Sequence, residues 1–343
     1  MIDASVLVVG AGAIGGVTAA KMAGGGRRVA VLDANTEHVA RMRSPGLDVE
    51  VLGEGRRVEL EAHADSADLE GPFDFALVTL KAPHLEAALE PLREGGLAET
   101  YVSLCNGLVQ ERIAGIVGTE NLVWGTVEWG STNVGPGRLA QTTRAPFVIG
   151  EPDGETRDRT RLLAEALGTV EDVRLTENIR GQVWSKLLVN SSLSGLGAVS
   201  GLLYREVMED PEGREVALAL WREGYDVGMA QELTLEKVLG VEAGDLVLRG
   251  PEGPEDRARV ERAVEVAMGH AGATKASMLQ DLERGLKTEV DVINGAVVGR
   301  GREYGVETPV NARVVELMHA MERGERRPGR DVFGELGDLI RGA

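Results

Sequence analysis

A glycine-rich turn directly behind a short apolar run constrains this chain more than any other feature. Residues 6–9 are apolar, the turn Gly10-Ala11-Gly12-Ala13-Ile14-Gly15 follows, and an alanine-rich segment begins after it. This order predicts a buried strand, a tight turn and a helix, which open a dinucleotide-binding α/β fold. Gly10 permits the turn, Gly12 lets the backbone approach a pyrophosphate, and Gly15 lets the helix pack closely on the strand. The residues expected to bind the nucleotide are Gly10, Gly12, Ala13, Ile14 and Gly15.

Asp33 indicates which nucleotide is bound, because it ends the next apolar run, residues 28–32. A carboxylate at this strand end accepts hydrogen bonds from the adenosine ribose hydroxyls and repels a 2′-phosphate. We therefore expect NAD(H) to be preferred, with NADP(H) as the second possibility. Two structural alternatives stay open. Asp33 could cap a helix over residues 35–43, and the glycine-rich turn could belong to an α/β domain that binds no ligand.

The composition is that of an ordinary globular protein and argues against several classes of partner. The 343 residues are 43% hydrophobic and 27% charged, which fits about two domains. A formal net charge of −18 disfavours nucleic acids and anionic membranes, which attract basic surfaces. The chain has one cysteine, Cys105, expected to be a packing residue, and no segment typical of a secretory leader or a membrane span. We expect a cytoplasmic protein without a metal site.

The first half of the chain alternates between strand-like and helix-like segments. Such alternation predicts a mostly parallel sheet with crossover helices, and hence a Rossmann-like domain over residues 1–176. The expected strands are 73–80 and 101–104, with closing strands at 122–127, 138–142 and 146–149, helices near 84–92 and 109–116, and a turn at 135–137.

The second half has helical periodicity to its end, which predicts an all-helical domain over residues 177–343. Residues 241–256, rich in Glu, Gly and Pro, are expected to form an exposed loop or an insertion. The cleft between the two domains is the expected active site. The predicted helices cover 178–200, 214–231, 257–270, 275–284, 288–304 and 310–323.

Lys186 is unusual because lysine is scarce in this chain and this one lies in the apolar segment 183–190. Asn190 follows one helical turn later and Ser194 continues the same face. A polar stripe on an apolar helix must face water, a partner or a cleft. The structural alternative is a lysine whose stem covers apolar surface at a domain junction.

A second polar cluster lies near the C-terminus, at residues 283–291. Gly285 is typical of a helix end, Thr288 of an N-cap, and Asp291 has the spacing of a capping box. Glu289 then falls in the first turn of the next helix, where the helix dipole favours a carboxylate. From this pattern alone, Glu289 is a stabilising residue rather than a catalytic one.

In combination these segments resemble the ketopantoate reductase family, the 2-dehydropantoate 2-reductases, along nearly the whole chain. The matching segments are 10–15, 78–82, 106–107, 184–190, 276–281 and 288–295. The resemblance implies that Lys186 is the catalytic general acid and that Glu289 is a carboxylate acting in substrate binding and catalysis. The other implied residues are Asn106 at the nicotinamide and the substrate, Asn190, Ser194 and Ser277 at the substrate, and Lys81 near the cofactor.

The chemistry implied by the resemblance is reduction of a 2-oxo acid, most directly 2-dehydropantoate to pantoate in pantothenate synthesis. Hydride transfer to a carbonyl carbon builds negative charge on the oxygen, which an ammonium such as Lys186 can stabilise and then protonate. The partner is then a small 2-oxo or 2-hydroxy acid, and a homodimer is compatible with the sequence.

Three departures from the family pattern keep other functions open. Asp33 stands where the family usually has a basic or neutral residue, Ser194 where many members have asparagine, and 141–144 where a glycine-rich stretch is common. The second hypothesis is an NAD-dependent dehydrogenase of another 2-hydroxy or polyhydroxy acid. The third is a nucleotide sensor without turnover, which the joint presence of the lysine, amide, hydroxyl and carboxylate groups disfavours.

Overall fold

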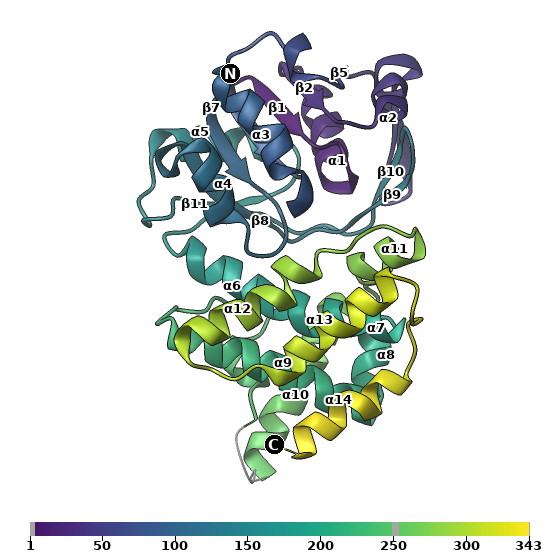
Figure 1. Cartoon of the computed structure of the whole chain (residues 1–343). Coiled ribbons are helices and arrows are strands. Elements are labelled where there is room, and N and C mark those ends of the chain that lie inside the picture. Colours follow the sequence, from purple (N-terminus) through teal and green to yellow (C-terminus); the bar gives the residue numbers. More distant parts are fainter. Residues whose placement is uncertain (1–3, 249–253, 343) are drawn as a thin grey trace. The chain divides into compact units, whose positions relative to one another are not determined.

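The computed structural model describes residues 4–248 and 254–342 of the chain, which form two compact units (Figure 1). The first, here the α/β unit, comprises Met1–Cys105 and Val109–Ile179. The second, here the helical unit, comprises Asn106–Leu108 and Arg180–Ala343. Each unit has its own hydrophobic core. The structure confirms the predicted class, a Rossmann-like α/β fold followed by helices.

The α/β unit is built on an eight-stranded sheet with the strand order β12-β11-β8-β7-β6-β1-β2-β5. Every neighbouring pair is parallel except β8 with β11. Because β2 and β6 flank β1 on opposite sides, the strand order reverses at β1, where sheets of this kind bind ligands at the carboxyl ends of their strands. The strands are β1 Val6–Val9, β2 Val29–Leu32, β5 Glu61–His63, β6 Phe73–Val78, β7 Ala98–Ser103, β8 Leu122–Val127, β11 Phe147–Gly150 and β12 Val173–Leu175.

Five α-helices cover this sheet, and α1 packs directly on β1 and β2 (Figure 1). Four short helical turns accompany them: a π-turn at Met42–Gly46 and 3-10 turns at Ser66–Asp68, Ala82–His84 and Thr119–Asn121. The helices are α1 Ala13–Ala23, α2 Thr36–Arg41, α3 Leu85–Glu94, α4 Gln110–Val117 and α5 Asp158–Leu167.

A second sheet, with the order β4-β3-β10-β9, was not predicted. It consists of β3 Leu47–Val51, β4 Glu54–Val58, β9 Ser131–Gly135 and β10 Arg138–Gln141. The assignment of 138–142 as a closing strand was therefore wrong: this segment pairs with β3, about ninety residues earlier, and with β9. The sequence of β4 lacks the alternation of apolar and polar residues that marks a strand, because its side chains are largely exposed. The predicted turn at 135–137 is confirmed as the link between β9 and β10.

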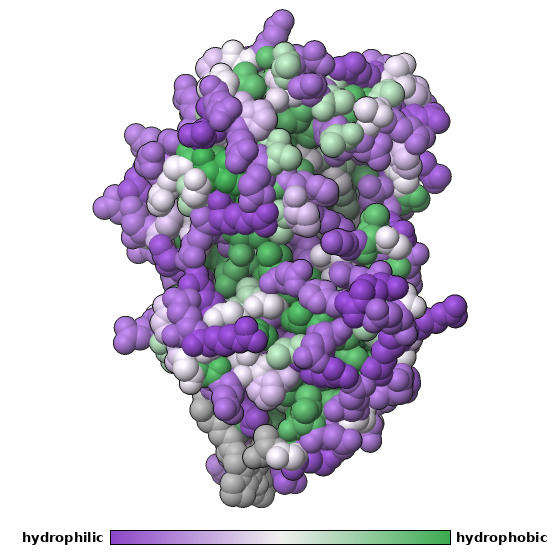
Figure 2. Space-filling model, in the orientation of Figure 1, coloured by the Kyte–Doolittle hydropathy of each residue, from purple (hydrophilic) through white to green (hydrophobic). Residues whose placement is uncertain are grey.

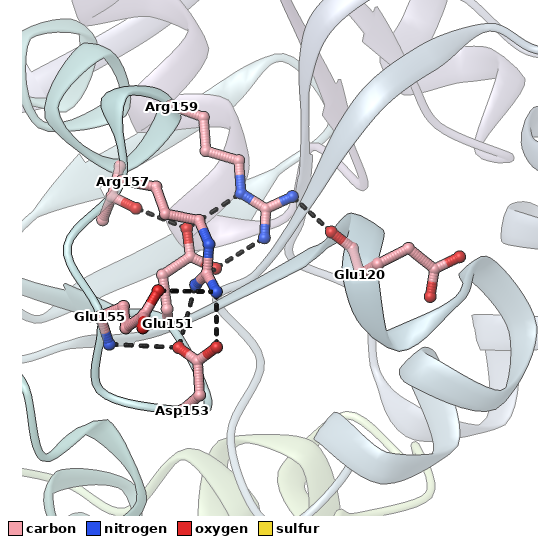
Figure 3. A network of polar contacts seen from close by, with 7 residues as sticks. Glu120, Glu151, Asp153, Glu155, Arg157 and Arg159 are labelled. Atoms are coloured by element: carbon pink, nitrogen blue, oxygen red, sulfur yellow. Dashed lines mark hydrogen bonds and ion pairs between the residues drawn. The ribbon is translucent and has the colours of Figure 1, made fainter.

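Buried and exposed charges fasten the loop after β11 to α5 (Figure 3). The carboxylate of Glu151 is buried and accepts hydrogen bonds from Arg159, at 2.9 and 2.6 Å, and from the Thr160 hydroxyl at 2.5 Å. Arg157 pairs with Asp153, and this ion pair holds the pKa of the Asp153 carboxyl well below its usual range. The cluster thus connects the loop that follows β11 to the start of α5.

In the helical unit the predicted run 178–200 is nearly continuous, as α6 Ile179–Val189, a π-turn at Asn190–Ser194 and α7 Gly195–Ser200. Two helices, α8 and α14, were not predicted. The last helix buries Val332, Phe333 and Leu336 against the unit and packs on α9. The other helices are α8 Tyr204–Glu209, α9 Pro211–Ala230, α10 Pro254–Ala271, α11 Ser277–Glu283, α12 Asn294–Tyr304, α13 Pro309–Glu322 and α14 Asp331–Gly342.

The prediction of an exposed loop over 241–256 was wrong for its described parts. A 3-10 turn, Ala243–Leu246, contacts α9 and α10, and Val241, Ala243, Leu246 and Val247 are all buried. The indole N–H of Trp221 donates to the Ala243 carbonyl oxygen at 2.9 Å. These apolar residues are spaced among the polar ones, so composition alone concealed the packing. Helix α10 already begins at residue 254, and residues 249–253 lie outside the described ones.

Polar side chains cover most of the visible surface, in keeping with the net charge of −18 (Figure 2). Within the described part of the chain, no helix combines the length and the apolar character needed to span a membrane. The large apolar side chains that are exposed come from separate elements: Leu52, Val134, Leu175, Met229, Val266, Leu286, Tyr304 and Leu339.

Candidate functional site

The glycine-rich loop has the geometry that its glycines predict. Gly10 has φ +92°, a conformation that side chains disfavour. A Cβ atom on Gly15 would lie 2.0 Å from the Gly10 carbonyl oxygen, so only glycine lets α1 approach β1 this closely. Gly12 is the N-cap of α1 with extended backbone, and a Cβ atom there would meet nothing within 4 Å. The start of α1 is thus open on this side and lacks a side-chain cap among the described residues.

Thr79, at the end of β6, stabilises this loop and was missed by the sequence analysis. Its backbone N–H donates to the Val9 carbonyl at 3.0 Å, and its hydroxyl donates to the Gly10 carbonyl at 2.6 Å. The hydroxyl also lies 2.3 Å from the Cβ that Gly15 lacks. The family-like segment 78–82 contains Thr79, but nothing in that segment indicates a contact with a backbone group seventy residues away.

Asp33 lies directly after β2 and holds two backbone N–H groups. Its Oδ2 accepts from Ala11 at 2.7 Å, and its Oδ1 accepts from Asn35 at 2.9 Å. The N-cap of α2 is Asn35, whose side chain accepts from the His38 N–H at 3.0 Å. The alternative in which Asp33 caps this helix is therefore wrong, and Asp33 is attached to the glycine-rich loop instead. Ala13 and Ile14 begin α1, and Lys81 follows β6 as the N-cap of the turn Ala82–His84.

In the helical unit, the structure brings Lys186 together with Asn106. Lys186 lies on α6, and its Nζ donates to the Asn106 Oδ1 at 2.9 Å. The segment Asn106–Leu108 is held against the turn Val290–Val292, because the Leu108 N–H donates to the Val292 carbonyl at 2.9 Å. Gly107 has φ +73°, and a Cβ there would lie 2.4 Å from that same carbonyl oxygen. The glycine after Asn106 thus permits the close approach that fixes the amide beside the lysine.

The polar stripe after Lys186 passes through a π-turn, which the α-helical spacing did not predict. Asn190 begins this turn and Ser194 ends it. Ser194 is 2% exposed and hydrogen-bonded to the Tyr204 hydroxyl, and burial raises the pKa of Tyr204 to about 12. Wider turns of this kind occur frequently at functional sites because they redirect the side chains that follow.

Glu289 is buried and lies just before the 3-10 turn that holds Asn106–Leu108. The predicted helix start at residue 288 was wrong, since α12 begins at Asn294 and Glu289 is not in its first turn. The predicted capping box is also absent. Asp291 pairs with His319 at 2.9 Å, while the Thr288 N–H and hydroxyl both donate to Glu322, at 2.8 and 2.7 Å. Partners on α13 therefore replace the predicted box, and locally the Thr288 hydroxyl accepts from the Val290 N–H at 3.3 Å. Ser277 is exposed at the first position of α11.

A buried polar network ties the π-turn to three helices of the same unit. The Asn294 side chain donates to the Ser191 carbonyl at 2.8 Å and to the Asn311 Oδ1 at 2.9 Å. Asn311 donates in turn to the Glu223 carboxylate, from its side chain at 2.7 Å and from its backbone at 2.9 Å. Burial raises the pKa of Glu223, although these N–H groups favour its ionised form. None of these three side chains was singled out in the sequence.

Replacing Asn311 by alanine is expected to lower the free energy of unfolding by about 1–3 kcal/mol, because it removes partners from two buried groups. The loss should be larger at pH 8 than at pH 5. The folded-state pKa of Glu223 is raised, so its contribution to stability is present at low pH and is lost as the pH rises through that pKa. Losing a donor to the carboxylate raises the pKa further. Urea unfolding at both pH values measures this, and a loss that does not grow with pH would contradict it.

Comparison with known proteins identifies the family. The family model described as "Ketopantoate reductase PanE/ApbA" matches residues 6–154, and its C-terminal counterpart matches residues 178–322. A 2-dehydropantoate 2-reductase of Mesorhizobium japonicum is 30% identical to the chain, over 93% of this chain and 98% of the relative. The chain belongs to the ketopantoate reductase family. It is accordingly an oxidoreductase of the class that acts on CH-OH groups.

A second relative carries the same name, and solved structures have a similar fold. A 2-dehydropantoate 2-reductase of Archaeoglobus fulgidus is 28% identical, over 93% of this chain and 98% of the relative. The ternary structure of D-mandelate dehydrogenase with NADH and anilino(oxo)acetate has a TM-score of 0.80 at 24% identity, covering 93% of this chain and 99% of that one. A PanE/ApbA family ketopantoate reductase from Ralstonia eutropha has a TM-score of 0.78 at 23% identity, with the same coverage. These structures share the fold.

Proposed function

We propose that this protein reduces a 2-oxo acid with a nicotinamide cofactor, that 2-dehydropantoate is its substrate, and that NAD(H) is preferred. The observation that carries the proposal is the 2.9 Å hydrogen bond from Lys186 Nζ to Asn106 Oδ1. This hydrogen bond positions the Lys186 ammonium group. Its acceptor is an uncharged amide, so this contact does not neutralise the positive charge. Such a group can stabilise a developing oxyanion and then give up a proton.

The residues of the α/β unit fit a dinucleotide. The open backbone at Gly12, the uncapped start of α1 and the close packing at Gly15 together form the kind of cradle that accepts a pyrophosphate. Asp33 supplies the carboxylate expected at an adenosine ribose, while its contact with Ala11 leaves it further lone pairs. A bound nicotinamide supplies the hydride that the reduction requires.

The helical unit is proposed to supply the proton and the substrate contacts. Lys186 donates the proton from Nζ to the carbonyl oxygen, and Asn106 orients the ammonium through its amide oxygen. Glu289 accepts a hydrogen bond from a substrate hydroxyl. The substrate carboxylate and hydroxyl groups are then bound by Asn190, Ser194 and Ser277.

A second candidate is NAD-dependent oxidation of a different 2-hydroxy acid. Asp33 favours it, because the carboxylate selects against the 2′-phosphate of NADP(H). Ser194 also favours it, since the family resemblance implies a longer asparagine at this position in many members, and the Ser194 hydroxyl is hydrogen-bonded to Tyr204. The D-mandelate dehydrogenase of the same fold, solved with NADH, acts on an acid of this class.

A substrate panel in both directions distinguishes the candidates. Purified protein is assayed with 2-dehydropantoate and other 2-oxo acids against NADH and NADPH, and with pantoate and other 2-hydroxy acids against NAD and NADP. The proposal predicts the highest kcat/KM for 2-dehydropantoate with NADH. A higher kcat/KM for another acid would support the second candidate function instead. The absence of turnover with every acid would refute both candidate functions.

A further inference from the structure

A buried histidine joins the glycine-rich loop to the turn between β9 and β10. His38 lies on α2 and is 3% exposed. Its Nε2 is 2.8 Å from the Ala11 carbonyl oxygen, and its Nδ1 is 2.8 Å from the Gly137 backbone nitrogen. All three residues belong to the α/β unit. The ring thus bridges two segments that are more than one hundred residues apart in the sequence.

The two backbone partners determine where the imidazole carries its proton. The Gly137 N–H can only donate, so Nδ1 must accept and therefore carries no hydrogen. The Ala11 carbonyl can only accept, so Nε2 must carry the hydrogen and donate it. The two contacts thus assign the hydrogen to Nε2, and both polar atoms of the ring have a partner.

Ala11 is held at both of its backbone polar groups by side chains that follow β2. Asp33 accepts from its N–H at 2.7 Å, and His38 donates to its carbonyl oxygen at 2.8 Å. In a trans peptide the carbonyl oxygen and the next N–H point in opposite directions. Holding the Ala11 oxygen toward His38 therefore directs the Gly12 N–H away from it, and fixes the peptide that opens the start of α1.

We propose that His38 is a positioning residue for dinucleotide binding, acting through the Ala11–Gly12 peptide of the glycine-rich loop. The inference rests on the proposed function, because it requires that this loop bind a nicotinamide nucleotide. His38 does not contact the nucleotide itself. It keeps a backbone donor in place before the nucleotide arrives, which lowers the cost of ordering the loop on binding.

Two substitutions separate the two hydrogen bonds of the ring. The amide nitrogen of glutamine can replace Nε2, so His38→Gln keeps a donor for Ala11. The amide oxygen of asparagine can replace Nδ1, so His38→Asn keeps an acceptor for Gly137 and loses the contact with Ala11. His270→Asn, at an exposed position of α10, is the matched control.

The test measures the NADH dissociation constant by fluorescence, the melting temperature, and kcat and KM, on the full chain. We expect His38→Asn to weaken NADH binding about three- to tenfold and to raise KM for NADH similarly, with kcat within about twofold of the wild type. His38→Gln should stay within about twofold in all three constants, as should the control. Equal weakening in both His38 variants, or none in either, would overturn the inference. Failure of the wild type to bind NADH would instead refute the proposed function.

Discussion

Lys186→Ala is expected to lower kcat by about 10²- to 10⁴-fold. The variant lacks both the charge that stabilises the oxyanion and the proton that neutralises it. The dissociation constant of NADH should change little, because the glycine-rich loop, Asp33 and Lys81 belong to the α/β unit, and only the proposed Asn106 contact lies in the helical unit with Lys186. Steady-state turnover and NADH fluorescence titration on the same preparation measure both quantities.

Two controls separate this role from a purely structural lysine. Lys186→Arg keeps the positive charge but should recover only part of the rate, since a guanidinium does not readily exchange its proton. The melting temperature of each variant reports any loss of packing by the lysine stem. Near-normal kcat in the folded Lys186→Ala protein, with a lowered melting temperature, would remove Lys186 from the mechanism.

The second large effect concerns the cofactor. The wild type is expected to prefer NADH over NADPH by at least about tenfold in kcat/KM, because the Asp33 carboxylate would face the 2′-phosphate without a cationic partner. Asp33→Arg should move the preference toward NADPH. The variant also loses the acceptor for the Ala11 N–H, so weaker binding of both nucleotides is expected alongside the change in preference.

Asp33→Asn is the matched control, since it removes the charge and keeps an oxygen that can accept from Ala11. Asp33→Asn should lower the ratio of kcat/KM for NADH to that for NADPH. It should weaken NADH binding less than Asp33→Arg does. Initial rates with both nucleotides at saturating acid substrate measure each value. Equal kcat/KM for NADH and NADPH in the wild type would contradict the role given to Asp33.

Much of the fold followed from local patterns. The first strand–turn–helix segment, from β1 to α1, was predicted because its structure depends on neighbouring residues. Its glycines are needed where a side chain would clash or where φ is positive. The long helices α9, α10 and α13 were found within a few residues, because each buries one apolar face. The predicted helix 178–200 is instead divided by a π-turn into α6 and α7. The sheet of β3, β4, β9 and β10 was missed, since its parallel pair joins segments about ninety residues apart and β4 is mostly exposed.

Residues of the candidate site could be singled out from the sequence only where their local pattern is unusual. Lys186 was singled out because a charge within an apolar helix is conspicuous, and the role proposed for Asn106 came only from the family resemblance. Thr79 and His38 could not be found, because each acts on a backbone carbonyl of the glycine-rich loop and backbone groups leave no sequence signal. The environment of Glu289 was misjudged, since contacts with α13 outweigh the local capping pattern that the sequence contains.

Transfer of a labelled hydride tests whether this protein reduces 2-dehydropantoate with a nicotinamide cofactor. NADH carrying deuterium at both hydrogen positions of nicotinamide C4 is incubated with the purified protein and 2-dehydropantoate, and the product is examined by mass spectrometry. The account predicts pantoate carrying deuterium at C2 from the wild type, and far less product in the same time from Lys186→Ala. Pantoate without the label, or no reduced product from the wild type, would contradict it.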